Sequence, residues 1–192
     1  TAQVQALKSA QVVALTTDQL SAIETRDIAA LSSAQVVALS GTQVGAMTTA
    51  QLSGMDTAQV ASIAVANVSS ITTDQLVALN TAQVVALTTV QVGALTANQV
   101  SVLETGDVAV LTTAQLDVIT AADFATLGTD QLQALTTTQV ASLATDKLNA
   151  LSSTKLNALE TADMAALTTS QVASIATGMV GRSEEHTSEL QS

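Results

Sequence analysis

The sequence repeats with a period of eight residues over almost its whole length. If the octad is labelled a to h, with Ala10 at position a, then position f holds Leu, Ile or Met in every octad from Leu7 to Ile175. Position c is apolar from Val4 to Val172, position b is mostly Gln, and positions g and h are mostly Thr or Ser. A repeat kept in phase over about 22 octads is typical of solenoids, in which each unit buries its apolar face against neighbouring units.

Two regular geometries fit this period poorly. A continuous helix turns by about 100° per residue, so a side chain repeated every eight places would circle the helix and leave no fixed apolar face. A β-solenoid requires residues of one parity to face inward, but the apolar positions c and f have opposite parity. Glycines at a fixed turn position are also missing. The β-solenoid is kept as the alternative fold.

The pattern favours an all-α solenoid of very short capped helices, with one helix in each eight-residue repeat. In a representative octad, Thr72 at position g has the place of an N-cap, and Gln75 three residues later completes a capping box. Ile71 at f and Leu76 at c would then form the hydrophobic staple. Position h is even more strictly Thr or Ser, so a cap shifted to h is also considered. Because such a helix is unstable alone, neighbouring octads must stack around a shared core.

A longer spacing accompanies the octad. Asp18, Asp74 and Asp130 open similar octads at intervals of 56 residues, which is seven octads. Either duplication of a seven-octad block or the geometry of the superhelix would produce this spacing. The pattern leaves open the number of octads in one superhelical turn and the hand of the turn.

The octads end at Thr177. This divides the chain into a repeat solenoid over residues 1–177 and a non-repeat tail over residues 178–192. The closing string RSEEHTSELQS resembles the in-frame translation of a sequencing adapter, so we expect the tail to be artefactual or disordered. The one histidine of the chain, His186, lies in this tail.

The composition disfavours most classes of catalytic and binding chemistry. The chain has no Cys and one His, which excludes a disulfide framework, a thiolate zinc site, a thiol nucleophile and a site with several His ligands. The net charge of −11 disfavours nucleic acid and anionic membranes as partners. No apolar run reaches the ~18 residues that a membrane span needs. We therefore predict a protein that is not an enzyme, with no catalytic, cofactor-binding or metal-binding residues and no cofactor.

We predict that the charged residues inside the repeats have structural roles and bind no ligand. Three E-T-x-D units place two carboxylates near one predicted helix start, where interaction with the helix dipole is favoured over a cation site: Glu24/Asp27, Glu104/Asp107 and Glu160/Asp163. The cations of the repeat region stand singly, so they are expected to be solvated and to form no phosphate-binding patch: Lys8, Arg26, Lys147 and Lys155.

The L-T-T-x-Q-V-x-A octads of residues 1–177 resemble the tandem arrays of very large, repetitive bacterial proteins, many of them secreted or on the cell surface. The resemblance implies a structural role and carries over no catalytic residue. We predict a non-enzymatic spacer, stalk or adhesin-type scaffold of a larger protein, extracellular or at the cell surface, with adjoining domains and an unknown protein or surface partner. The alternative is an array that binds ice or divalent cations through rows of Thr or of Asp and Glu.

Overall fold

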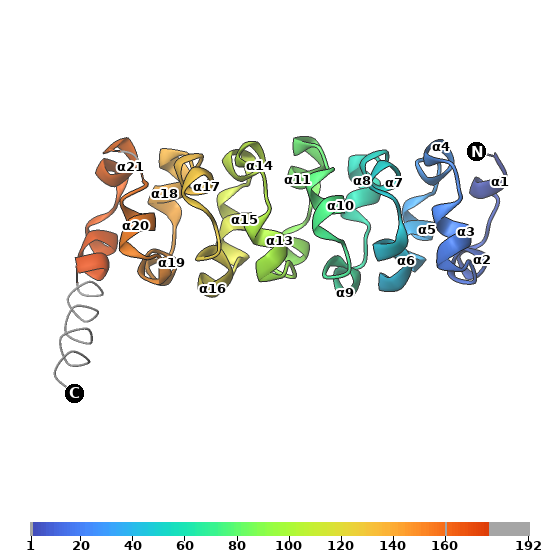
Figure 1. Ribbon diagram of the computed structural model, residues 1–192, viewed down its shortest axis with the longest axis horizontal. Helices are drawn as coiled ribbons and strands as arrows, with labels where there is room; N and C mark the ends of the chain where they lie inside the picture. Colours follow the sequence, from blue (N-terminus) through green and yellow to red (C-terminus); the bar gives the residue numbers. More distant parts are fainter. Residues whose placement is uncertain (1, 160, 177–192) are drawn as a thin grey trace, which may run out of the picture.

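The fold is taken from a computed structural model that describes residues 2–159 and 161–176. These residues form one elongated superhelix of short α-helices, with no strand among them (Figure 1). The predicted all-α solenoid is thereby confirmed, and the β-solenoid alternative is wrong. The tail predicted over residues 178–192, with His186, lies outside the described residues.

The helices α1 to α21 have four to six residues each, with one helix in each eight-residue repeat. The helices are α1 (Ala2–Gln5), α2 (Ser9–Val13), α3 (Thr17–Ser21), α4 (Thr25–Ile28), α5 (Ser33–Ala38), α6 (Gly41–Ala46), α7 (Thr49–Ser53), α8 (Thr57–Ala61), α9 (Val65–Val68), α10 (Thr73–Val77), α11 (Thr81–Ala86), α12 (Thr89–Val92), α13 (Ala97–Ser101), α14 (Thr105–Val110), α15 (Thr113–Val118), α16 (Ala121–Phe124), α17 (Thr129–Gln133), α18 (Thr137–Ser142), α19 (Thr145–Ala150), α20 (Ser153–Leu156) and α21 (Thr161–Ala166). Residues 169–176 are also helical.

The helices begin where the capping pattern predicts. In α10, Thr72 has an extended backbone, and its hydroxyl accepts a hydrogen bond from the backbone N–H of Gln75 at 3.2 Å. The Gln75 side-chain oxygen in turn accepts from the N–H of Thr72 at 2.8 Å. Both staple residues, Ile71 and Leu76, are buried. The cap is therefore position g, and a cap shifted to h is wrong.

The corners between helices need no left-handed backbone. After α5, Leu39 at position f is extended, with φ −60° and ψ 139°, and leads directly into the next N-cap, Ser40. No described residue has a positive φ. Since the corner uses only extended and helical conformations, glycine is not required there, which explains why the sequence has no glycine at a fixed position.

The core is one continuous apolar column along the superhelix. Side chains at c and f point inward, and from Leu31 to Leu159 all of them are buried. The single aromatic residue, Phe124, replaces the usual Val or Leu at position c and is fully buried.

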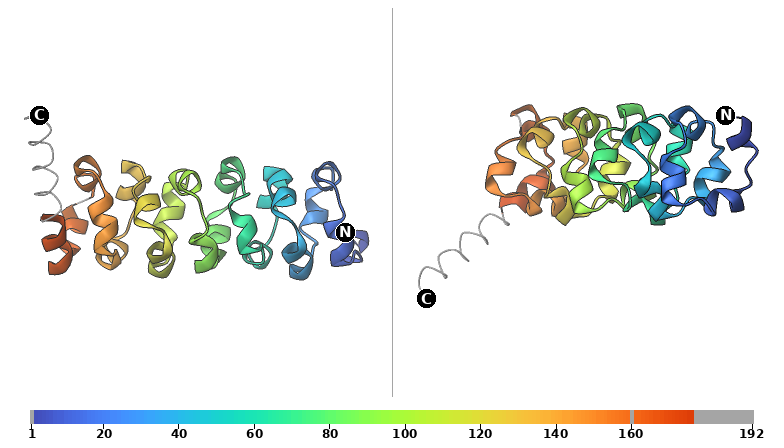
Figure 2. Two further views of the ribbon diagram at one scale, coloured as in Figure 1. Left: turned by 90° about the horizontal axis from the view of Figure 1, so that it is seen from below. Right: turned by 45° about the vertical axis from the view of Figure 1, so that its right-hand side comes forward.

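Between three and four octads make one turn of the superhelix. Helices pack against the helix three positions further along the chain, as α2 does on α5 and α3 on α6. Hydrogen bonds also join α10 to α6, four positions earlier. Along one edge of the molecule the helices α4, α7, α11, α14, α18 and α21 follow one another, in alternating steps of three and four (Figure 1). The two further views show the same regular stacking (Figure 2).

The 56-residue spacing matches two turns of this superhelix. One step of three octads and one of four together make seven octads, so residues 56 positions apart lie two turns apart on one side of the superhelix. Asp18 in α3, Asp74 in α10 and Asp130 in α17 are related in this way, and all three are exposed.

Candidate functional site

The most distinctive polar feature of the molecule is a row of buried glutamines at position b. From Gln35 onward, the described glutamines at b are at most 9% exposed. A polar side chain buried to this degree must satisfy its hydrogen-bonding groups inside the protein. The contacts of this side chain therefore decide what the array can do.

Gln75 illustrates the arrangement. Its side-chain oxygen caps its own helix by accepting the N–H of Thr72. Its side-chain amide group donates to the backbone carbonyls of Val44 at 3.0 Å and Met47 at 2.6 Å, at the end of α6 one turn earlier. We call this pair of connections, from one glutamine to its own N-cap and to the carbonyls 28–31 residues earlier, the glutamine bracket.

The bracket satisfies two helix ends with one side chain. The carbonyl at c accepts the backbone N–H of the residue at f, as Val44 does from Met47 at 3.2 Å, and has a second acceptor site left, whereas the residue at f, being extended, leaves its own carbonyl outside the helix. The amide group of the bracket supplies the donors for these acceptors. The described glutamines that donate to carbonyls one turn earlier are Gln35, Gln43, Gln51, Gln59, Gln75, Gln83, Gln91, Gln99, Gln115, Gln131, Gln139 and Gln171.

Asparagine and lysine at position b also donate hydrogen bonds to backbone carbonyls one turn earlier. The amide group of Asn67 donates to the Leu39 carbonyl at 2.6 Å. The ammonium group of Lys147 donates to the Asp117 carbonyl at 2.8 Å, and this lysine is only 3% exposed. Lys155 donates to the Ala125 carbonyl. The prediction that these two lysines are solvated is wrong, because they occupy a donor position that faces the preceding turn.

An ionised aspartate at position b cannot donate a hydrogen bond to the carbonyls of the preceding turn, as the glutamines do. Asp107 is 3% exposed, and its burial raises the pKa of its carboxyl group. The carboxylate of Glu104 acts in the same direction, whereas a hydrogen bond from Thr81 lowers this pKa. The physical cause of the shift is desolvation of the charged form.

In two of the three E-T-x-D units, both carboxylate residues lie within the described part of the chain. Glu24 and Glu104 are the N-cap residues of α4 and α14, but neither side chain makes a cap hydrogen bond. The Glu24 carboxylate pairs with the side chain of Arg26 at 2.7 Å instead, on the surface. Both glutamates lie at helix starts, as predicted, whereas Glu160 of the third unit lies outside the described residues.

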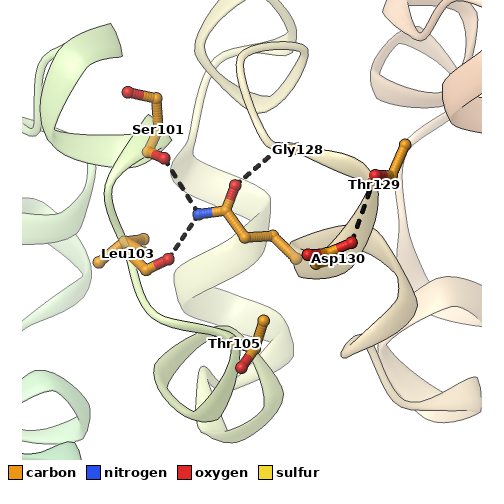
Figure 3. Close-up of a pocket in the computed structure, with 7 residues that line it drawn as sticks. Ser101, Leu103, Thr105, Gly128, Thr129 and Asp130 are labelled. Atoms are coloured by element: carbon orange, nitrogen blue, oxygen red, sulfur yellow. Dashed lines mark hydrogen bonds between the residues drawn. The ribbon is translucent and has the colours of Figure 1, made fainter.

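One hollow of about 350 Å³ opens to solvent beside a bracket (Figure 3). Gly128 stands at the N-cap position where most octads carry Thr or Ser, so no cap side chain fills the space. Gln131 behind it is held by the N–H of Gly128 and by the carbonyls of Ser101 and Leu103. The lining residues are Ser101, Leu103, Thr105, Gly128, Thr129, Asp130 and Gln131.

This hollow offers little chemistry. Its amide group is already fully bonded in the bracket, and its one carboxylate, Asp130, is exposed and accepts a hydrogen bond from Thr129 at 3.4 Å. Among residues 2–159 and 161–176, no group of three His, Cys, Asp or Glu side chains is placed to hold a metal ion. Within the same part of the chain, no helix has the length and apolarity to span a membrane.

The amide donor of the bracket was missed by the sequence analysis, although the sequence carries a signal for it. Glu serves the capping box as well as Gln, yet Glu never occurs at position b. Gln, Asn and Lys share a donor that Glu lacks, and together they fill most b positions. This preference indicates a second hydrogen bond in which the side chain donates.

Comparison with known proteins identifies the repeat. A family model described as the ALTTAQ repeat matches residues 20–57, 68–103, 100–137 and 140–177. Neither the curated proteins nor the solved structures include a match to the chain.

Proposed function

Because the chain belongs to the ALTTAQ repeat family, we propose that it is a non-enzymatic structural array that acts as a spacer, stalk or adhesin-type scaffold. Its task is extension: the number of octads sets the distance between whatever the two ends are attached to. The regular surface also offers repeated weak contacts along its length.

The glutamine bracket is the observation that carries this proposal. Its acceptors are backbone carbonyls, which every octad presents whatever its side chains. Any octad can therefore stack on any other, provided that c, f and b keep their character. A rod built by such a rule grows by an equal increment for each added octad, which suits a spacer of adjustable length.

We also propose that the protein is located outside the cell. The chain has no Cys and a net charge of −11, which agrees with an exported stalk that depends on no redox condition. In this proposal the rod is attached to adjoining domains of a larger protein. It holds them at a distance from an unknown protein or surface partner.

Small-angle X-ray scattering tests the proposed extension. Removing residues 58–113 deletes seven octads and joins Thr57 at position h to Ala114 at position a, so both the octad phase and the superhelical phase are kept. We expect the maximum dimension to fall in proportion to the octads removed, with an unchanged cross-section. An unchanged maximum dimension, or a compact particle in either protein, would contradict a spacer.

A ligand-binding array of Thr or of Asp and Glu rows is the competing function. The hydroxyls at position g are engaged as helix caps, as Thr72 and Thr88 are, which leaves them less suited to ordering water. The aligned Asp18, Asp74 and Asp130 lie two turns apart, too far to share one cation. A higher melting temperature of the protein on adding calcium would favour this alternative over the spacer. So would thermal hysteresis, a gap between the melting and freezing temperatures of a solution of the protein.

A further inference from the structure

The brackets are not spread evenly along the rod. At every f position from Leu7 to Ile71, the backbone carbonyl accepts a hydrogen bond from an amide side chain one turn later. Beyond Ile71 this series has gaps. Within the described part of the chain, no side chain one turn later donates to the f carbonyls of Leu79, Leu95, Ile119 and Leu127.

Charged residues at position b cause these gaps. Asp107 and Asp123 carry carboxylates, which accept hydrogen bonds and do not donate them. Lys147 and Lys155 donate to carbonyls at position d, so the f carbonyls of the same corners stay without a donor. We call residues 2–104 the complete segment and the described residues from 105 to 176 the interrupted segment.

The interrupted segment also buries charge between its turns. Asp107 and Lys147 are each 3% exposed, whereas the residues at b from Gln35 to Gln99 all carry neutral amides. Removing a charge from water costs more free energy than removing an amide that keeps its hydrogen bonds. The turns of the interrupted segment are therefore held together less strongly than those of the complete segment.

The apolar column nevertheless continues through the interrupted segment. From Leu103 to Leu159, every side chain at c and f is buried, and Phe124 is fully so. The interrupted segment is thus folded like the rest of the rod. It differs from the complete segment in the polar contacts between its turns.

We propose that the rod yields in two stages under tension, with the interrupted segment unwinding before the complete segment. A bracket joins residues on successive turns, so a pull along the rod loads the brackets turn by turn. A turn held by fewer hydrogen bonds separates at a lower force. Because the turns of a solenoid contact only their neighbours, one segment can unwind while the other stays folded.

Two-stage yielding would make the array an extensible tether. This inference rests on the proposed stalk function, because only an array that connects two attachment points is put under tension. Each residue that unwinds adds about 3.5 Å of chain, so residues 105–176 supply roughly 250 Å of extended chain and residues 2–104 roughly 360 Å. The complete segment would keep its fold while the interrupted segment takes up the first extension.

Single-molecule stretching of the full chain tests the proposal. The chain has no Cys, so Thr1→Cys and Ser192→Cys supply two unique attachment points for optical tweezers. At neutral pH we expect a first group of steps that releases the length of the interrupted segment, and a second group at higher force. One all-or-none step, or a first group that releases the length of the complete segment, would overturn the proposal.

A repair variant assigns the first group of steps to the gaps. It carries Asp107→Gln, Asp123→Gln, Lys147→Gln and Lys155→Gln, which together leave the net charge unchanged. We expect the forces of the first group to rise to those of the second. The matched control removes two acids and two cations at exposed positions and should keep both groups: Lys8→Gln, Arg26→Gln, Asp74→Gln and Asp130→Gln. Two groups that persist in the repair variant would show that the gaps do not set the order.

Hydrogen exchange measures the same difference without force. Val84 and Phe124 are both c residues at most 1% exposed, and their amides donate to the N-cap carbonyls at 3.0 and 2.8 Å. The turn of Val84 is bracketed on both sides, by Gln83 and by Gln115, whereas Phe124 follows Asp123.

We expect the Phe124 amide to be roughly three- to tenfold less protected than that of Val84, although its side chain is larger. Asp123→Gln should raise the protection of Phe124. Equal or greater protection of Phe124 in the wild type would contradict a weaker interrupted segment.

Failure of this inference can be told apart from failure of the spacer. Small-angle scattering measures the length of the rod at rest, whereas stretching measures the order in which it yields. A rod that is extended at rest and yields in one step would leave the spacer intact and remove the two-stage tether.

Discussion

At the scale of single residues, the array depends on the difference between an amide and a carboxylate. Both can accept a hydrogen bond from the N-cap, but only the amide can also donate. A buried donor or acceptor without a partner costs more than the bond itself contributes. The choice of Gln at position b is therefore a choice for the contact between turns.

Gln83→Glu tests this difference in the interior. Gln83 is 1% exposed and donates to the carbonyls of Ser53 and Met55 at 3.0 and 2.6 Å. The substitution turns a carboxylate toward carbonyl oxygens, so we expect a loss of about 2–4 kcal/mol in the free energy of unfolding. Gln19→Glu is the matched control, since the same side chain is exposed there; thermal unfolding in dilute solution should show an effect near zero. Equal losses at the two positions would contradict the bracket.

Asp107 introduces a pH dependence with a defined sign. Its pKa is raised above the usual 3.8, so the native state binds the proton more tightly than the unfolded chain. Stability therefore falls as pH rises from the unfolded pKa through the higher folded pKa, and the penalty is fully present above both. We expect Asp107→Asn to be stabilising relative to wild type at neutral pH, with a difference that shrinks toward pH 3.

Chemical denaturation of the two proteins across this pH range measures the difference. Comparing the variant with wild type cancels the contribution of the other carboxylates. A difference that stays constant with pH would mean that Asp107 has the same pKa in both states.

At the scale of one helix, close contact between turns decides where glycine is required. A Cβ atom added to Gly45 in α6 would lie 2.8 Å from the backbone oxygen of Ser70, next to α9. The same atom added to Gly106 in α14 would meet nothing within 4 Å. Neither glycine has a positive φ, so backbone strain plays no part.

Gly45→Ala and Gly106→Ala form a matched pair. We expect Gly45→Ala to destabilise the protein by about 1–3 kcal/mol, because two turns must move apart. We expect Gly106→Ala to be neutral or to stabilise by up to ~1 kcal/mol, because Ala restricts the unfolded chain and favours the helix. Melting temperatures of both variants check the sign, and a similar loss in both would refute close packing at Gly45.

The hollow beside Gly128 allows a cap to be restored. A Cβ atom there would lie 3.5 Å from the side-chain oxygen of Gln131, which is an ordinary contact. Gly128→Ser should therefore fill the space, accept from the N–H of Gln131 as other caps do, and stabilise by about 0.5–1 kcal/mol. Gly128→Ala adds a similar volume without the hydroxyl, so a gain equal to that of Ser would assign the effect to backbone entropy alone.

At the scale of the whole molecule, each turn is stabilised by the turns that cover it. The segments 16–20 and 72–76 have the same sequence, TTDQL, and lie two turns apart. In both, the Leu amide donates to the N-cap carbonyl at 2.9 Å and the Leu side chain is buried. They differ in one respect: Gln75 is bracketed to α6, whereas Gln19 faces no earlier turn.

Hydrogen exchange compares these two identical segments directly. We expect the amide of Leu76 to exchange more slowly than that of Leu20, because the end turn opens locally at a lower cost in free energy. Equal protection would mean that the array unfolds as one unit in spite of its local contacts.

The helix-forming part of this structure was readable in the sequence because it is local. The cap at Thr72, the box with Gln75 and the staple of Ile71 with Leu76 all lie within six residues and follow from backbone geometry. The site was less readable: the amide of Gln75 was assigned to the cap alone, and Lys147 was taken for a solvated side chain. Their partners lie 28–31 residues away, at a distance that no local pattern specifies.

The period of eight and the residues at c, f and g were thus enough to determine short capped helices around a single apolar column. Only the tertiary structure decided how many octads close a turn, because that number depends on how helices pack on the third and fourth helix along the chain. The same packing decided which polar groups are buried, and so turned a row of glutamines into the connection between turns. The 56-residue spacing was visible in the sequence, but it acquired a geometric meaning only when two successive steps around the superhelix were seen to span seven octads.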